Sequence, residues 1–327
     1  MGQEPAYEQV EQEIAPQAPI TVIRTRTVVL LLLVTLVFGL VKGYLLGSRR
    51  MASSAATRSD PTATPSKQAN LIDQINPPNG YTVPAVFGDL GPSLLAAGAI
   101  DYDRFAQLYQ QIGRSLTDEQ IALLTKGSAA PVVINRDNAH FLLNFFWAVG
   151  LANKNRVLDE GPMKTYSKGQ IGGFASTGGW TLGAKSPEAL YASTLMIALT
   201  PEQQARLEEV ASGVYRPCCN NPTHFPDCNH GMAMLGLLEL MASQGASVDQ
   251  MFTAAKYVNA FWFPQQTLEL AKFFQARQGV DFAQADARQL VGKGYSSGSG
   301  FPTVHKWLAD NGLLEQAPSA GGSCGVG

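Results

Sequence analysis

Residues 140–152 read HFLLNFFWAVGLA and are apolar at almost every position. A helix that is apolar on all sides lies in the interior of a protein, whereas a surface helix keeps one polar face. The run is too short to cross a bilayer, which takes about 20 apolar residues. Asp137 or Asn138 can cap its start. The sequence therefore predicts a central core helix on which the rest of the fold packs.

Helical patterns recur on both sides of this run. Apolar residues at three-and-four spacing predict a helix over residues 102–112, and Thr117 with Gln120 makes a capping-box pattern before the next one. Further helices are predicted over residues 187–199, 201–214, 229–243, 248–263, 264–277 and 301–310. The predicted fold class is mostly α, with a compact multi-helix globular domain over residues 81–317.

One stretch of this domain lacks helical periodicity. Residues 163–185 are rich in glycine and aromatic side chains, and we expect a long loop or a small hairpin there. Gly183, Lys185 and Ser186 are not contiguous in the way that a phosphate-binding loop requires. Nucleotide hydrolysis is therefore unsupported.

The N-terminal part predicts a membrane anchor. Residues 27–46 read TVVLLLLVTLVFGLVKGYLL, a length that matches the hydrocarbon core as a single transmembrane helix. A cleaved signal peptide is the rival interpretation, although that class has a shorter apolar region. Residues 1–26 would form an N-terminal tail that precedes the span.

Residues 47–80 are expected to be a flexible Ser/Thr/Pro-rich linker, which favours a soluble domain on the extracytoplasmic side. The expected localisation is therefore a single-pass membrane protein, with the lipid bilayer as a partner through residues 27–46. The net charge of −2 offers no basic face for phosphate backbones, so nucleic acid is not an expected partner.

The chemistry of the sequence is concentrated in residues 216–232, RPCCNNPTHFPDCNHGM. The chain has 4 cysteines, and Cys218, Cys219 and Cys228 fall close together in this segment. Prolines and Asn/Asp residues predict a rigid loop. Asp227 can cap the following helix, which would put Cys228 in the first turn. There, the helix dipole favours a thiolate over a thiol.

A thiolate is both a nucleophile and a metal ligand. The leading hypothesis is a membrane-anchored domain that binds a transition metal, zinc or copper, for metal handling or structure. The predicted ligands are the three clustered cysteines and a nearby imidazole, namely Cys218, Cys219, Cys228 and His230, with His224 in reserve. Met232 and Met234 would suit copper, but their spacing also fits the packing face of a buried helix. The cysteine spacing matches none of the strong zinc signatures.

Two alternatives stay open at this point. In the first, the protein is a thiol-disulfide oxidoreductase or another cysteine-dependent enzyme whose nucleophile is Cys228 or Cys219. In the second, it is an anchored interaction domain in which a structural disulfide closes the loop. Cys324 lies in a Gly-rich tail, residues 318–327, that we expect to be flexible and from which it could join the cluster.

Overall fold

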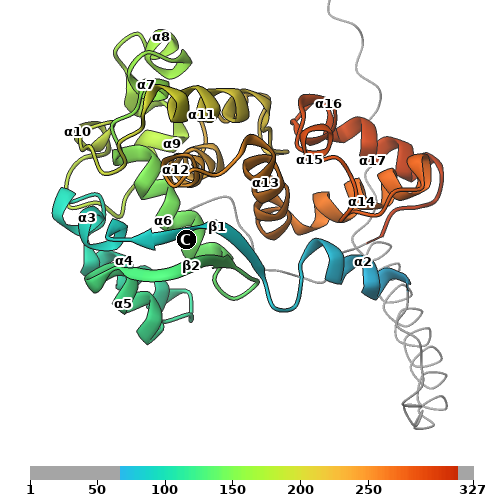
Figure 1. Ribbon diagram of the computed structural model, residues 1–327, viewed down its shortest axis with the longest axis horizontal. Coiled ribbons are helices and arrows are strands. Elements are labelled where there is room, and N and C mark those ends of the chain that lie inside the picture. The colour runs from blue at the N-terminus through green and yellow to red at the C-terminus, as the bar shows by residue number, and fades with distance from the viewer. Residues whose placement is uncertain (1–66, 316–327) are drawn as a thin grey trace, which may run out of the picture. The chain divides into compact units, whose positions relative to one another are not determined.

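The computed structural model describes residues 67–315 (Figure 1). Most of these residues are helical, and two strands pair as a small sheet. In chain order the elements are α2 (Lys67–Ile75), β1 (Tyr81–Gly88), α3 (Leu90–Ala97), α4 (Tyr102–Gln111), α5 (Asp118–Lys126), β2 (Ser128–Ile134), α6 (Ala139–Ala152), α7 (Arg156–Asp159), α8 (Pro162–Ser167), η1 (Ile171–Gly173), α9 (Ala175–Gly178), α10 (Pro187–Leu190), α11 (Pro201–Gly213), α12 (Asn229–Ser243), α13 (Val248–Trp262), α14 (Pro264–Gln278), α15 (Ala287–Leu290), α16 (Lys293–Ser296) and α17 (Phe301–Asp310).

The core is organised by the packing of α6 against α12 (Figure 1). Every residue of α6 except His140 is buried, so the predicted core helix is confirmed. The two helices approach closely because each contributes a glycine. A Cβ on Gly150 would overlap the carbonyl oxygen of Met232, and a Cβ on Gly236 would lie 2.5 Å from the carbonyl oxygen of Phe146. The missing side chains let backbone contact backbone.

Several predicted helices have the predicted boundaries to within a residue or two. They are α4, α5, α11, α12, α13, α14 and α17. The capping box at Thr117 and Gln120 is present at the start of α5, and Thr200 with Gln203 makes a second one at α11. Local capping chemistry therefore marks the starts of α5 and α11.

The antiparallel pair of β1 and β2 was not predicted from the sequence. These strands pair across the intervening α3, α4 and α5, so no short turn marks them as a hairpin. On β1, the side-chain amide of Gln244 at the end of α12 acts like a further strand residue. Its Oε1 accepts from the backbone N–H of Val86 at 2.8 Å, and its Nε2 donates to the carbonyl of Val86 at 2.9 Å.

The Gly-rich segment is neither a long loop nor a hairpin. It folds into the short helical turns α8, η1 and α9, with irregular chain up to α10. Trp147 of α6 donates its indole N–H to the carbonyl of Ser176 at 2.6 Å, which ties the segment to the core helix. Tertiary contacts of this kind order a segment that lacks periodicity.

The helix predicted over residues 187–199 is shorter than expected, because α10 ends at Leu190. The chain then turns to satisfy the free carbonyls at the end of α6. Ala192 donates its backbone N–H to Leu151 and Thr194 donates to Ala152, both at 2.9 Å. Ala192 takes a positive φ of 48° at this turn. Four carbonyls at a helix end lack intrahelical partners, and this demand overrides the local helical pattern.

The predicted membrane architecture needs correction. Within residues 67–315, no helix is long and apolar enough to cross a bilayer. The longest of these helices have 15 residues, or about 22 Å against a hydrocarbon core of about 30 Å. The predicted span, residues 27–46, lies outside the described residues. Because the described residues contain no membrane-spanning helix, the predicted single-pass fold class and the localisation based on it are withdrawn.

The helix α2 lies inside residues 47–80, where the sequence predicts a flexible linker. Leu71 and Ile75 are buried, and the helix packs against α13 and α14. The folded body therefore begins before Tyr81. Residues 1–66 and 316–327, which include the predicted tails and Cys324, lie outside the described residues.

Candidate metal centre

The loop between α11 and α12 carries the clustered cysteines and is held by backbone contacts at several points. Thr223 donates both its backbone N–H and its hydroxyl to the carbonyl of Val214, at 2.9 and 3.1 Å. His224 donates its backbone N–H to Ala211 of α11 at 2.9 Å. The loop thus folds back on the end of α11, which returns the chain to the start of α12 at Cys228.

The start of the loop is positioned from distant parts of the chain. Tyr215 donates its backbone N–H to Val291 at 2.8 Å and accepts at its carbonyl from the Asn259 side chain at 3.0 Å. Cys219, farther along the loop, accepts at its carbonyl from the backbone N–H of the distant Gly298 at 2.8 Å. These long-range contacts fix the vicinal cysteine pair relative to α12.

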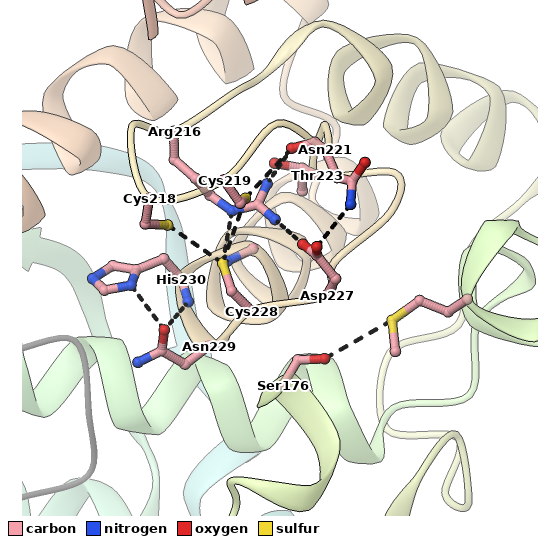
Figure 2. A network of polar contacts seen from close by, with 12 residues as sticks. Ser176, Arg216, Cys218, Cys219, Asn221, Thr223, Asp227, Cys228, Asn229 and His230 are labelled. Carbon is pink, nitrogen blue, oxygen red and sulfur yellow. Dashed lines mark hydrogen bonds and ion pairs between the residues drawn. The ribbon is translucent and has the colours of Figure 1, made fainter. Parts of the chain in front are cut away.

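The three cysteines converge at the first turn of α12 (Figure 2). Their sulfur atoms all lie within 4.8 Å of one another. The Sγ atom of Cys228 is 3.5 Å from that of Cys218 and 3.9 Å from that of Cys219. All three are free cysteines, and Cys218 is the exposed member. We call these three side chains the sulfur triangle. It can hold a metal ion.

Arg216 is the charged partner of the sulfur triangle, and only 1% of its surface is exposed. Its Nε donates to Cys228 Sγ at 3.0 Å and its Nη2 donates to Asp227 Oδ1 at 3.0 Å (Figure 2). Its Nη1 donates to the carbonyl of Asn221 at 3.1 Å. A Cβ on Gly231 would overlap the guanidinium group, so this glycine makes room for it.

The surroundings of Cys228 favour its thiolate. Hydrogen bonds from Cys218 and Cys219, together with the charge of Arg216, hold the pKa of Cys228 well below its usual range, although burial opposes this. Cys228 is also the N-cap of α12, where its Sγ accepts from the backbone N–H of Gly231 at 3.4 Å. Unpaired N–H groups at a helix start stabilise an anion.

The other two thiols are held in the neutral form. Hydrogen bonds with Cys219 and Cys228 raise the pKa of Cys218. The contact with Cys218 lowers the pKa of Cys219, but the hydrogen bond with Cys228 and burial outweigh it, so the net shift is upward. Cys228 is therefore the thiol of the three that ionises most readily.

The predicted imidazole ligands do not join the sulfurs. Among residues 67–315, the group of ligand atoms at this place consists of Cys218, Cys219 and Cys228. The His230 ring is buried against Phe263, with ring centroids 4.5 Å apart, and its Nδ1 lies 2.9 Å from Asn229 Oδ1 (Figure 2). Burial lowers the pKa of His230 to about 4.

Met232 and Met234 are buried in the core of the fold together with Met241. They belong to the packing face of α12, which the sequence offered as the alternative to a copper role. No role for Arg216 was predicted from the sequence. Its signal was a lone arginine beside the cysteine pair, with the opposite charge of Asp227 directly before the third cysteine.

The arrangement is capable of two kinds of chemistry. Three adjacent thiols can surround one thiophilic ion, and a low-pKa thiolate beside a second thiol can exchange with a disulfide. Comparisons of the chain with models of protein families, with curated proteins and with solved structures found no match. The functional assignment therefore rests on the geometry of the sulfur triangle.

Proposed function

We propose that the protein binds one transition metal ion, zinc or copper, through Cys218, Cys219 and Cys228. The observation that supports this proposal most directly is that the three sulfur atoms all lie within 4.8 Å of one another. Three thiolates bound to one ion at about 2.3 Å would lie about 3.8 Å from one another. The observed spacings of 3.5 and 3.9 Å from Cys228 bracket that value, so an ion needs little rearrangement of the loop.

The charges around the triangle support the same proposal. Three thiolates concentrate negative charge, which must be offset inside a protein. Arg216 and the N–H groups at the start of α12 supply positive charge on the side of Cys228. The hydrogen bond from Arg216 also orients this sulfur, in the way that outer-shell donors orient metal ligands.

Metal analysis of the full chain tests the proposal. The reduced protein, purified without chelator and with a tag that binds no metal, is incubated with each ion separately and desalted. We expect about one ion per chain, lost in Cys228→Ser and in Cys219→Ser. Cys324→Ser and His224→Ala serve as matched controls and should keep the ion. A reduced, folded chain that retains neither zinc nor copper would overturn the proposal.

Thiol-disulfide exchange is a second candidate, favoured by one pair of side chains. The thiolate of Cys228 lies 3.5 Å from the exposed thiol of Cys218, which is the arrangement of an attacking and a resolving cysteine. Such an enzyme needs these two residues and tolerates Cys219→Ser, whereas the metal site needs all three.

Turnover of a model disulfide by Cys219→Ser but not by Cys228→Ser would favour exchange. Counting thiols distinguishes the structural alternative, because a chain with 4 cysteines and one disulfide shows only two titratable thiols before reduction.

A further inference from the structure

The groups that surround the sulfur triangle are already committed to other partners. The Oδ1 atom of Asp227 accepts from Arg216 at 3.0 Å, and its Oδ2 accepts from the Asn221 side chain at 2.7 Å. The ring of His230 is buried, and its Nδ1 lies 2.9 Å from Asn229 Oδ1. Within residues 67–315, the group of ligand atoms that lie within 4.8 Å of one another at this place consists of the three sulfurs. Zinc takes four ligands in structural sites, so three sulfurs leave a zinc ion one ligand short, whereas three thiolates complete the coordination of the soft ion copper(I).

The positive charge of Arg216 also favours binding of copper(I) over zinc. Its guanidinium cannot lose its proton in a protein, and it contacts Cys228 directly at 3.0 Å. With the same three thiolates, the repulsion between Arg216 and a doubly charged ion is twice that with a singly charged one. Arg216 therefore shifts the preference of the site toward a monovalent ion.

The triangle is also accessible from one side. Cys218 is exposed, while Cys219 and Cys228 are partly buried. Sites that hold an ion for structure alone are closed by their ligands. An exposed thiolate ligand allows an incoming thiol to approach the ion before any protein ligand has left.

We propose that the cargo of the sulfur triangle is copper(I), held by three sulfurs and passed to a thiol-bearing acceptor by exchange at Cys218. This inference rests on the proposed metal-binding function. In the first exchange a copper–sulfur bond forms to the acceptor as the bond to Cys218 breaks. Further acceptor thiols then replace Cys219 and Cys228 in the same way, which releases the ion from the protein. The proton of the acceptor thiol passes to Cys218 through solvent. Copper stays in the monovalent state, so no oxidant or reductant is needed.

Paired titrations of the reduced full chain under anaerobic conditions test the choice of ion. One uses copper(I) against a chromophoric copper(I) chelator, and the other uses zinc against a zinc chelator. We expect one copper(I) per chain, three sulfur neighbours by X-ray absorption, and displacement of zinc by equimolar copper(I). Tight four-coordinate zinc that copper(I) does not displace would overturn the inference and leave the proposed function standing. Binding of neither ion would overturn both.

The role of Arg216 is tested by Arg216→Gln. Loss of its charge is expected to lower the ratio of copper(I) to zinc affinity by about tenfold or more. Arg288→Gln is a matched control, because Arg288 is a surface arginine paired with Glu209 and Asp249 and touches no cysteine. Circular dichroism establishes that each variant is folded. An unchanged affinity ratio in folded Arg216→Gln would contradict the charge argument, and should this variant not fold, the paired titrations alone decide.

The exchange step has its own kinetic readout. Copper(I) transfer from the full chain to reduced glutathione, followed by loss of the thiolate-to-copper absorption, should speed up in proportion to the glutathione concentration. Transfer at a rate independent of glutathione would mean that the ion leaves before the acceptor arrives. That outcome would overturn exchange at Cys218.

Discussion

The first turn and the middle of α12 make opposite uses of close packing. In its middle the helix packs on α6 at Gly236, and Gly150 of α6 approaches the carbonyl of Met232. At its first turn the helix meets a polar loop with three thiols and a guanidinium. In both places a glycine makes room for the neighbouring group. Gly236 lets the backbone of α6 approach, whereas Gly231 leaves space for the side chain of Arg216.

The difference follows from what a helix offers along its length. In the middle, all backbone groups are paired and only side-chain shape is left for recognition, so this part serves packing. At the start, the first N–H groups lack intrahelical partners and stabilise an anion such as the Cys228 thiolate. The same helix therefore carries chemistry at its first turn and stability along its middle. The following variants test this division, from the largest expected effect to the smallest.

Gly150→Val should have the largest effect, and on stability. Its Cβ would overlap the carbonyl of Met232, and backbone in a packed core cannot move away cheaply. We expect the free energy of unfolding in urea to fall by about 3 kcal/mol or more. Gly173→Ala is the control, because nothing lies within 4 Å of its added Cβ. Equal stability of the two variants would show that the α6–α12 contact does not support the fold.

Gly231→Ala should disturb chemistry more than stability. The added Cβ overlaps the guanidinium of Arg216, which must shift away from Cys228. We expect a loss of about 1–3 kcal/mol in the free energy of unfolding. The pH midpoint for alkylation of Cys228 should move upward, because part of its thiolate stabilisation is lost. Peptide mapping after timed alkylation measures this, and an unshifted midpoint would separate Gly231 from the thiolate.

Glu239→Gln tests how the part of α12 that packs in the core contributes to the pH dependence of stability. Glu239 is fully buried, and burial raises its pKa well above the usual value. Its Oε2 accepts from Asn153 Nδ2 at 3.0 Å, at the end of α6. The unfolded carboxyl ionises at an ordinary pKa, so the stability contributed by this group is complete below that pH and is lost as the pH rises toward the folded pKa.

The glutamine side chain of the variant does not ionise, so Glu239→Gln should be more stable than the parent chain at pH 7. The two should converge below about pH 4, where the parent carboxyl is protonated in both states. Urea unfolding across this pH range measures the difference. A constant difference at all pH values would mean that ionisation of Glu239 is not its source.

His224→Ala should have the smallest effect. The histidine contacts the fold through its backbone N–H, which the substitution keeps. We expect the free energy of unfolding to change by less than about 0.5 kcal/mol and metal stoichiometry to stay the same. Loss of the ion in this variant would restore His224 as a ligand and refute the three-sulfur assignment.

The helices were predictable where local chemistry defines them. Capping at Thr117 and Thr200, and the nearly continuous apolar run of α6, are signals that few neighbouring residues can override. The pair of β1 and β2 and the short α10 were not predictable in the same way. Their formation depends on partners far away in sequence, such as Gln244 for β1 and the end of α6 for the chain after α10.

In the candidate site, too, some features were predictable from the sequence and others depended on tertiary packing. The sequence by itself determined that three cysteines stand close together in a proline-bent loop before a helix, because short spacing limits how far apart they can lie. Only the tertiary structure decided that the grouped ligand atoms are the three sulfurs without His230, since the burial of His230 against Phe263 depends on the packing of α12 with α13. Tertiary packing also brought Arg216 to Cys228, because a charged side chain enters the interior only where its hydrogen-bond partners are assembled around it.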